Sequence, residues 1–327
     1  MTEQLLLDPA RKPDMAGVKR AAKKIAAILP PTPLLPLIIE GTTVWCKAEC
    51  LQPIGAFKIR GGWHRLTDLD EDQKHRGVVA FSSGNHAQGV AWAAQRLGIK
   101  ATIIMPADAP AAKLENTKKL GAKVITYDRL TESREEIATE VAGKNGAVLV
   151  PSFADPWVIE GQGSTGIEIR QQMIDQSGSE PDHLVICCGG GGLASGISLA
   201  NPEANITVVE PEGWDDMKRS LENGRIVPVR DNPPATDCDA LQTLLVSPLT
   251  FDILKEHQAK GVTVSETEVH HAMRIAYEQL RLVIEPGGAV ALAAILAGKA
   301  PVTNHTALTL SGGNIDRKYF AKIMGDR

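Results

Sequence analysis

The feature that most constrains the fold is a regular alternation of short apolar runs and helical stretches between Gly77 and Val150. The runs VVAF, ATIIM, KVITY and AVLV each have the length and residue types of a buried strand. Stretches with helical periodicity separate them, at 85–97, 110–120 and 132–143. Strands that alternate with helices in this way are typical of parallel βαβ units. The sequence therefore predicts an α/β fold in this region.

The same alternation continues on both sides of this region. Because it extends to the end of the chain, we expect an α/β architecture throughout. The proline-rich pieces, among them Pro33 and Pro36, read as loops. The expected elements are, in chain order, a strand at 43–46, a helix at 57–66, a helix at 156–177, a strand at 183–188, a helix from Leu193, a strand at 206–210, helices at 266–280 and 287–298, and a strand at 304–311.

Length and composition limit what such a chain can do. At 327 residues it exceeds the usual size of one hydrophobic core, so about two domains are expected. A formal net charge of -4 gives no electrostatic footprint for nucleic acid, and no run of about 18 apolar residues predicts a membrane span. The cysteines form no C-x-x-C pair, which favours reduced core thiols. We expect a cytoplasmic protein whose partner is a small molecule, without nucleic-acid or membrane binding.

A run of consecutive glycines at 189–192 stands directly after an apolar strand and directly before a predicted helix. Without side chains, successive backbone N–H groups can turn inward and, with the positive helix N-terminus, surround a phosphate group. A flexible turn is the alternative, but a strand-to-helix turn does not need so many glycines. The G-x-G-x-x-G fingerprint of nucleotide-binding sites does not fit this run well. A nucleotide site stays an alternative, because Glu210 at the end of the next strand is an acidic residue of the kind that binds the ribose. We interpret the run as a phosphate cradle.

Two further polar turns follow predicted strands. Residues 82–89 read SSGNHAQG and precede an alanine-rich helix. Their hydroxyl, amide and N–H groups can hold a carboxylate at the helix N-terminus, and Asn85 can hydrogen-bond an aromatic hydroxyl. Simple N-capping is the alternative. Residues 310–314, LSGGN, place polar atoms at the carboxyl edge of a strand, where α/β sheets bind ligands.

The sequence resembles fold-type II pyridoxal-phosphate enzymes, specifically the serine/threonine dehydratase and serine racemase family. The matching segments span almost the whole chain, and His86 after Asn85 is similar to the dehydratase branch. The resemblance implies two three-layer αβα domains with mostly parallel sheets, a large one formed by 1–53 and 152–327 and a small mobile one formed by 54–151. It also implies a homodimer. The matching segments are TPL at 32–34, KAE at 47–49, GAFKIRG at 55–61, SSGNHAQG at 82–89, GQG at 161–163, the glycine run, EP at 285–286 and SGGN at 311–314.

The resemblance assigns the cofactor, pyridoxal 5'-phosphate, to a set of residues. Lys58 would condense with the cofactor aldehyde and later serve as a base, which requires burial to lower its pKa from the usual value of about 10.4. Ser311 would face the pyridine nitrogen, and a neutral hydroxyl there favours quick loss of a β-leaving group over a long-lived carbanion. The implied cofactor-binding residues are Phe57, Lys58, Asn85, Gly189, Gly190, Gly191, Gly192, Leu193, Glu285 and Ser311.

The implied reaction is the removal of water from a small β-hydroxy amino acid, which yields a 2-oxo acid and ammonia. Threonine and serine are the first choice. Ser83 would be a second catalytic residue on the face opposite the lysine, so a racemase stays an alternative. A 3-hydroxyaspartate-type substrate would need an additional cation that the sequence alone does not place. Besides a dehydratase and a racemase, a non-catalytic protein that binds a phosphorylated ligand is the third possible function. The implied substrate-binding residues are Ser82, Ser83, Asn85, His86 and Arg134, although Arg134 can equally be an exposed helix residue paired with a neighbouring glutamate.

The acidic segment VVEPEGWDDM offers a possible divalent metal site. The resemblance points to Glu210, Asp216 and the carbonyl oxygen of Trp214 as ligands, and such hard oxygen ligands suit Mg²⁺, Ca²⁺ or Mn²⁺. A solvated acidic helix start is the alternative. Residues 235–247 differ from the sequence that dehydratases commonly have in this region. Because the region lines the substrate pocket of the family, the identity of the substrate stays undecided.

Overall fold

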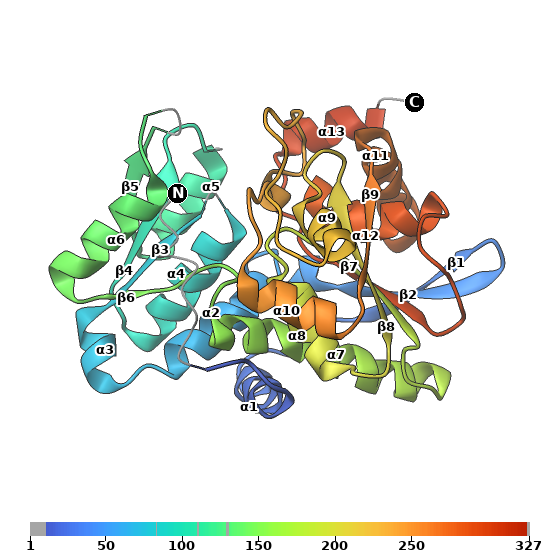
Figure 1. The fold of residues 1–327 in the computed structure, drawn as a ribbon, viewed down its shortest axis with the longest axis horizontal. Coiled ribbons are helices and arrows are strands. Elements are labelled where there is room, and N and C mark those ends of the chain that lie inside the picture. The colour runs from blue at the N-terminus through green and yellow to red at the C-terminus, as the bar shows by residue number, and fades with distance from the viewer. Residues whose placement is uncertain (1–10, 83, 110, 129–130, 326–327) are drawn as a thin grey trace.

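The computed structural model describes residues 11–82, 84–109, 111–128 and 131–325. The described strands form two separate sheets, one of four strands and one of six. In Figure 1 the four-stranded sheet and its helices lie to the left, the six-stranded sheet lies to the right, and helix α1 (Met15–Ala26) lies below both. The predicted alternation of strands and helices is therefore present in both halves of the molecule.

The four-stranded sheet has the order β5-β4-β3-β6, and each described pair of neighbours is parallel. Its core contains helix α4, in which every residue from Asn85 to Ala94 is buried because the alanine-rich sequence lets the helix pack closely on all sides. The helices expected at 85–97, 110–120 and 132–143 correspond to α4, α5 and α6. The elements of this half are α2 (Lys58–Thr67), α3 (Glu71–Arg76), β3 (Val78–Phe81), α4 (Asn85–Leu97), β4 (Ala101–Pro106), α5 (Ala111–Lys119), β5 (Lys123–Tyr127), α6 (Arg134–Asn145) and β6 (Val148–Leu149).

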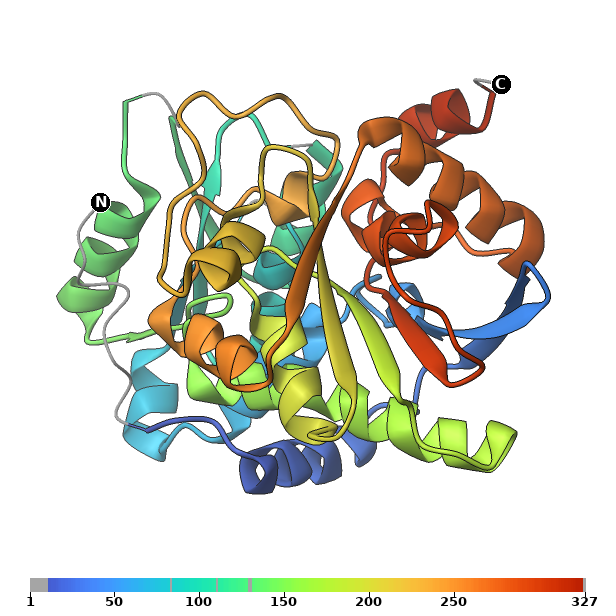
Figure 2. The ribbon, with the colours of Figure 1, turned by 45° about the vertical axis from the view of Figure 1, so that its right-hand side comes forward.

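The six-stranded sheet has the order β1-β2-β10-β7-β8-β9, in which only the β1–β2 pair is antiparallel among the described strands. Figure 2 shows β7, β8 and β9 side by side, with β10 and the β1–β2 hairpin to the right. The elements are β1 (Leu34–Ile39), β2 (Thr42–Ala48), a 3-10 turn η2 (Glu49–Leu51), α7 (Pro156–Ser177), β7 (His183–Cys187), α8 (Gly192–Ala200), β8 (Asn205–Pro211), α9 (Asp216–Asn223), a 3-10 turn η3 (Asp239–Leu241), α10 (Pro248–Glu256), β9 (Lys260–Val264), α11 (Glu266–Ile275), a π-helical turn η4 (Ala276–Leu280), α12 (Pro286–Leu296), β10 (Thr306–Leu310) and α13 (Arg317–Gly325).

Two expectations are wrong in detail. Pro36 was expected in a loop but lies within strand β1. Strand β1 is at the edge of its sheet, where a residue without a backbone N–H is tolerated because no further strand needs that donor. The helix expected at 266–280 is α-helical only to Ile275 and continues as the π-helical turn η4.

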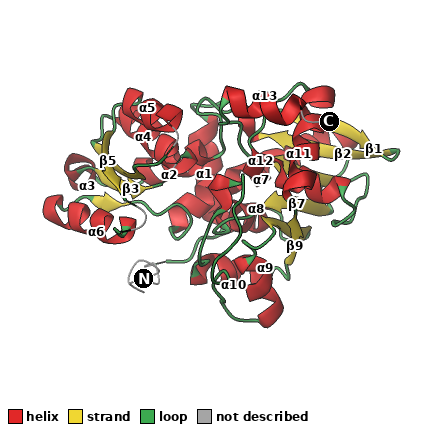
Figure 3. Cartoon of the chain, turned by 90° about the horizontal axis from the view of Figure 1, so that it is seen from above, coloured by secondary structure: helices red, strands yellow, loops and turns green. Residues whose placement is uncertain are grey.

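Helix α2 lies at the junction of the two halves. Figure 3 shows α1, α2 and α7 between the two sheets. A Cβ atom on Gly62 would lie 2.6 Å from the carbonyl oxygen of Gly89 in α4, and one on Gly161 in α7 would lie 2.5 Å from the Cα atom of Gly61. Only glycine permits such close backbone approach. These glycines therefore fix the position of α2, whose first residue is Lys58.

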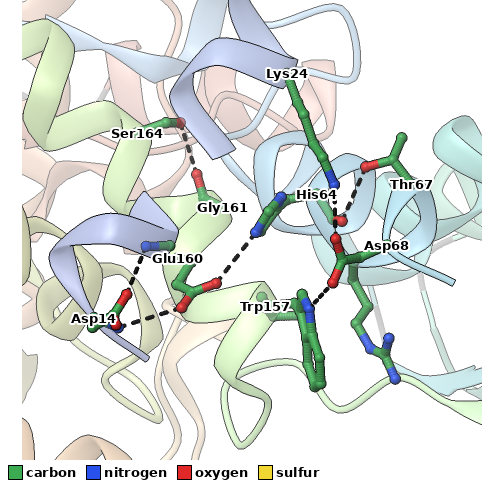
Figure 4. Close-up of polar contacts among 12 residues, drawn as sticks. Asp14, Lys24, His64, Thr67, Asp68, Trp157, Glu160, Gly161 and Ser164 are labelled. Carbon is green, nitrogen blue, oxygen red and sulfur yellow. Dashed lines mark hydrogen bonds and ion pairs between the residues drawn. The ribbon is translucent and has the colours of Figure 1, made fainter. Parts of the chain in front are cut away.

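A polar cluster at the start of α7 adds to this junction. Glu160 is buried and accepts a hydrogen bond of 2.6 Å from Arg11 Nη1. It also lies 3.3 Å from His64 Nε2 on α2 (Figure 4). The Arg11 guanidinium also stacks 4.3 Å from the ring centre of Trp157. Burial alone would raise the pKa of Glu160, but the hydrogen bond from Arg11 holds it at about 2. The cluster thus ties residue 11, α2 and α7 together.

Candidate active site

One cavity of about 200 Å³ lies between the two sheets and takes its lining from both of them. Every predicted cofactor- or substrate-binding residue that the structure describes lines this cavity. Ser83 lies outside the described residues. The predicted residues found in the lining are Phe57, Lys58, Ser82, Asn85, His86, Arg134, Gly189, Gly190, Gly191, Gly192, Leu193, Glu285 and Ser311.

Lys58 is the first residue of α2, and its side chain points into this cavity. Its Nζ atom donates a hydrogen bond of 3.0 Å to the carbonyl oxygen of Ser152 and lies 5.1 Å from the ring centre of Phe57. No described carboxylate forms an ion pair with it. Burial therefore lowers the pKa of Lys58 to about 8, because the charged ammonium is poorly solvated. An amine in this state is available as a nucleophile and as a base near neutral pH.

The glycine run forms the turn between β7 and α8, as expected. Gly191 has a φ of +84°, which side chains rarely adopt, and α8 begins at Gly192. A Cβ atom on Gly190 would lie 2.2 Å from the Phe153 ring, so a side chain there has no room. The turn presents backbone N–H groups and a helix N-terminus to the cavity, which is the arrangement that binds phosphate groups.

Asn85, Glu285 and Ser311 also line the cavity. Asn85 Nδ2 donates a hydrogen bond of 2.5 Å to Glu285 Oε1, and Asn85 Oδ1 accepts one of 2.8 Å from Asn314 Nδ2. Glu285 is buried, and its Oε2 atom has no hydrogen-bond partner among the described residues. Burial raises the pKa of Glu285 to about 7. These three residues therefore offer a fixed amide, a hydroxyl and an unpaired carboxyl oxygen to a polar ring.

The predicted carboxylate-binding residues differ in what they offer. His86 is buried, its Nε2 atom lies 2.9 Å from the carbonyl oxygen of Val150, and burial lowers its pKa to about 3. The imidazole is therefore neutral, and its one N–H is donated by Nε2 to that carbonyl oxygen. Nδ1 is left as an acceptor, so the ring offers a carboxylate neither a charge nor a hydrogen-bond donor. Arg134 starts α6, lies 5.4 Å over the Phe81 ring and pairs with Glu135 at 2.8 Å. Arg134 thus lines the cavity and also forms the ion pair considered as its alternative role.

The sequence did not predict several other residues of the cavity. Lys113 of α5 and Asp239 of η3 form an ion pair of 2.5 Å, which bridges the two halves of the molecule. Phe153 packs against the glycine turn, and Cys187 ends β7 inside the cavity. The local sequence did not identify Lys113 as a cavity residue, because a lysine on a helix is ordinarily exposed to solvent. Its proximity to Asp239 could only follow from the packing of the two sheets.

The predicted metal ligands lie at the carboxyl end of β8. Glu210 is buried, and its carboxylate accepts hydrogen bonds from the backbone N–H groups of Met217 at 3.0 Å and Lys218 at 2.8 Å. Both carboxylate oxygens of Asp216 are buried, and the polar groups next to them are the Val246 backbone and the Glu210 carboxyl group rather than a cation. Burial raises the pKa of Asp216 to about 7 and raises that of Glu210 as well, with the Asp216 charge adding to the latter shift. The two carboxyl groups therefore form a buried pair that lacks a counter-charge.

Comparison with known proteins decides the family. The model of the family described as "Pyridoxal-phosphate dependent enzyme" matches residues 25–312, which is most of the chain. The chain belongs to this family. The chain is similar to an L-threo-3-hydroxyaspartate ammonia-lyase from a Pseudomonas species, 40% identical over 87% of this chain and 88% of the relative. An L-threonine ammonia-lyase from Thermotoga maritima is also 40% identical, over 88% of this chain and 71% of the relative.

A solved structure of maize serine racemase shares the fold, with a TM-score of 0.87, 34% identity and coverage of 96% of this chain and 97% of that chain. The predicted fold type II architecture, with mostly parallel αβα sheets, is therefore confirmed. Also confirmed are the pyridoxal-phosphate cofactor and the enzyme class, a pyridoxal-phosphate-dependent lyase of the dehydratase and serine racemase group. None of the described helices combines the length and apolar character that a membrane crossing needs.

Proposed function

We propose that the chain is a dehydratase that converts a small β-hydroxy amino acid, serine or threonine in the first place, to a 2-oxo acid and ammonia. The observation that carries the proposal is the buried amine of Lys58, with its lowered pKa, in the same cavity as the glycine turn. The cavity fits pyridoxal phosphate because it combines an amine without an ion-pair partner, a turn with no room for side chains, and the unpaired Oε2 atom of Glu285.

The proposed roles follow from these positions. When bound, pyridoxal phosphate would supply an aldehyde that reacts with amines and a ring that accepts the electron pair released at the substrate Cα atom. The N–H groups of 189–192 would hold its phosphate, and Lys58 Nζ would remove the Cα proton. Asn85 is held by Glu285 and Asn314, so its amide orients the ring and the substrate carboxylate without rearrangement. The neutral hydroxyl of Ser311 favours departure of the β-hydroxyl over prolonged storage of negative charge at Cα.

Replacing Lys58 tests the central role. We expect Lys58→Ala to lose ammonia release and the visible absorbance of the bound cofactor, since both depend on the amine. Lys119→Ala is the matched control, because Lys119 is an exposed residue whose side chain is 73% accessible. A Lys58→Ala protein that keeps both signals would exclude the proposed role.

A second substrate, 3-hydroxyaspartate, is favoured by a specific observation. Lys113, which the sequence did not predict, adds a second cation to the cavity lining beside the predicted Arg134. The extra carboxylate of 3-hydroxyaspartate can displace Asp239 as the partner of Lys113. Because a charged hydrogen bond contributes about 1.5–3 kcal/mol, Lys113→Met is expected to lower kcat/KM for 3-hydroxyaspartate by about tenfold or more, with a smaller effect on serine.

A substrate panel separates the possible outcomes. Release of 2-oxo acid and ammonia from serine, threonine or 3-hydroxyaspartate supports the dehydratase and identifies its substrate. Formation of D-serine faster than pyruvate from L-serine would instead make the protein a racemase, and Ser83→Ala would then abolish inversion. Failure of all these substrates would overturn the proposal.

The proposal includes a homodimer in the cytoplasm, and light scattering of the purified holoenzyme tests the dimer.

The proposal also includes a divalent cation, Mg²⁺, Ca²⁺ or Mn²⁺, at Glu210, Asp216 and the carbonyl oxygen of Trp214. Its support is the buried carboxyl pair, because unpaired buried carboxylates are costly and hard oxygen ligands suit these ions. A cation there would bind beside the N-terminus of α9, close to the turn that follows β8. Its chemistry is structural, since none of the three residues lines the cavity.

A further inference from the structure

A second group of potential metal ligands lies where the loop before η3 meets α11. Asp237, Glu266 and His270 bring two carboxylates and an imidazole together, with one potential ligand atom from each within 4.8 Å of the others. Glu266 and His270 are four residues apart on α11 and therefore share one face of that helix. Asp237 faces them from the loop before η3. This group is distinct from the Glu210 and Asp216 pair, and none of its members lines the cavity.

Among the described residues, the hydrogen bonds around this group leave one buried carboxylate oxygen without a partner. His270 Nε2 lies 2.8 Å from Asp237 Oδ2, and Thr236 Oγ1 donates a hydrogen bond of 2.5 Å to Glu266 Oε1. The other carboxylate oxygen of Glu266, Oε2, is occluded from solvent and has no hydrogen-bond partner among the described residues. Leaving a carboxylate oxygen buried and unpaired costs free energy, which a bound cation would remove.

No described lysine or arginine neutralises these carboxylates. Within the described residues, the ion pair of Asp237 is with His270, and Glu266 forms none. Lys299, the lysine that reaches α11, pairs instead with Glu268 at 2.7 Å. The side chains of His270 and Asp237 remain 26% and 35% exposed, so an ion can enter from solvent. Two carboxylates therefore face each other with only an imidazole between them.

We infer that Asp237, Glu266 and His270 bind a first-row divalent transition-metal ion of the Zn²⁺ type. An imidazole nitrogen with carboxylate oxygens suits Zn²⁺, Co²⁺ or Mn²⁺, whereas Mg²⁺ and Ca²⁺ prefer oxygen ligands alone. Solvent can complete the coordination shell because the group is partly exposed.

The position of Asp237 gives the site a structural consequence. Asp237 lies two residues before Asp239, the first residue of η3, and Asp239 holds Lys113 across the cavity. A metal ion would fasten the loop to α11 and so restrict the segment that carries Asp239. The Tyr319 side chain of α13, which hydrogen-bonds Asp237, adds a third element to the same anchor. The site is therefore expected to stabilise the cavity wall without taking part in the reaction.

Calorimetric titration of the tag-free, chelator-treated holoenzyme with Zn²⁺ tests the inference. The wild type should bind Zn²⁺ with an affinity at least about tenfold higher than His270→Ala or Glu266→Gln. His271→Ala is the matched control, because His271 is the next residue on α11 but is exposed and outside the group. An Asp216→Asn background removes the other candidate site. Circular dichroism and cofactor absorbance verify that each variant is folded.

Bound Co²⁺ provides a second measurement that does not depend on activity. Its visible absorption should change when His270 is replaced, since the imidazole nitrogen leaves the coordination shell, and should be unaltered in His271→Ala. Equal Zn²⁺ affinity in wild type and His270→Ala, or no Zn²⁺ binding to the wild type, would overturn the site. Because the readouts are metal binding and spectra, failure here leaves the proposed dehydratase reaction unaffected.

Discussion

Two groups of buried carboxyl groups lie near the carboxyl ends of strands of the large sheet. One group is paired with buried cations, and the other is not. Arg60, two residues after Lys58, is fully buried and bonds Glu49 through Nε at 2.7 Å and Glu168 through Nη1 at 2.7 Å. Lys47 adds a bond of 2.6 Å to Glu168. The pair formed by Glu210 and Asp216 is equally buried but contains no cation.

The difference shows what each group does. Burial alone would raise the pKa of Glu49, but the charge of Arg60 lowers it to about 2, so this carboxylate stays ionised. The paired network locks the start of α2 against β2 and α7 and thereby positions Lys58. The pKa of Asp216 is instead raised to about 7, first by burial. The network with cations positions the Lys58 amine, whereas the carboxyl pair without a cation can bind a proton or a metal ion.

The largest effect is expected from Arg60→Ala, which leaves Glu49 and Glu168 without their cation. Removing one partner of a buried ion pair costs about 3–5 kcal/mol of unfolding free energy. Urea unfolding monitored by circular dichroism measures it. Arg170→Ala is the control, because Arg170 and Glu180 form an exposed pair whose loss should change stability by less than about 1 kcal/mol. Equal losses in the two variants would remove the contrast between buried and exposed pairs.

An opposite effect is expected from Asp216→Asn. In the presence of a chelator at pH 8, this variant should be more stable than wild type by about 2 kcal/mol, because a buried carboxylate without a counter-charge is removed. Added Mg²⁺ should stabilise the wild type but not the variant. The exposed Glu256 gives a control, Glu256→Gln, that should respond to neither condition. A chelated wild type that is the more stable protein would show that the Asp216 carboxylate is paired after all.

The two groups should also respond oppositely to pH. The folded-state pKa of Asp216 lies above its usual value of 3.8, so its destabilising effect is complete above about pH 7 and declines as the pH falls toward 3.8. The folded-state pKa of Glu49 is lowered from 4.5 to about 2, so its stabilising effect is present above pH 4.5 and is lost as the pH falls toward 2. Unfolding free energies of Asp216→Asn and Glu49→Gln relative to wild type, measured from pH 2 to pH 8, test both signs. Parallel pH profiles for the two variants would contradict this interpretation.

The smallest effect is expected from Ser164→Ala at the edge of the paired network. Ser164 Oγ accepts a hydrogen bond of 3.1 Å from Arg60 Nη1 and donates one of 2.7 Å to the carbonyl oxygen of Gly161. Arg60 keeps its two carboxylates in this variant, so the loss should be about 1 kcal/mol. Thermal unfolding measures it against Thr139→Ala, an exposed helix position. A loss as large as that of Arg60→Ala would mean that the hydroxyl, and not the ion pairs, holds α2.

Much of the fold and of the candidate site followed from local patterns. The strand, glycine and helix sequence around 189–192 requires the backbone turn that the structure shows, and Lys58 begins a helix as expected. Segments recognised only by resemblance, such as TPL and KAE, contribute Thr32, Lys47 and Glu49 to the buried network. Pro36 was misread because proline is compatible with either a loop or an edge strand, and only the sheet order distinguishes the two.

The sequence by itself determined the alternation of strands and helices, the glycine turn before α8 and the place of Lys58 at a helix start, because each depends on backbone geometry over a few neighbouring residues. Only the tertiary structure decided that Lys113 meets Asp239, 126 residues away, and that Asp237 meets His270 across 33 residues. Contacts of this kind depend on how the two sheets and their helices pack. The charge balance of each buried group depends on the same packing, since a carboxylate is paired or unpaired only once its distant neighbours are in place.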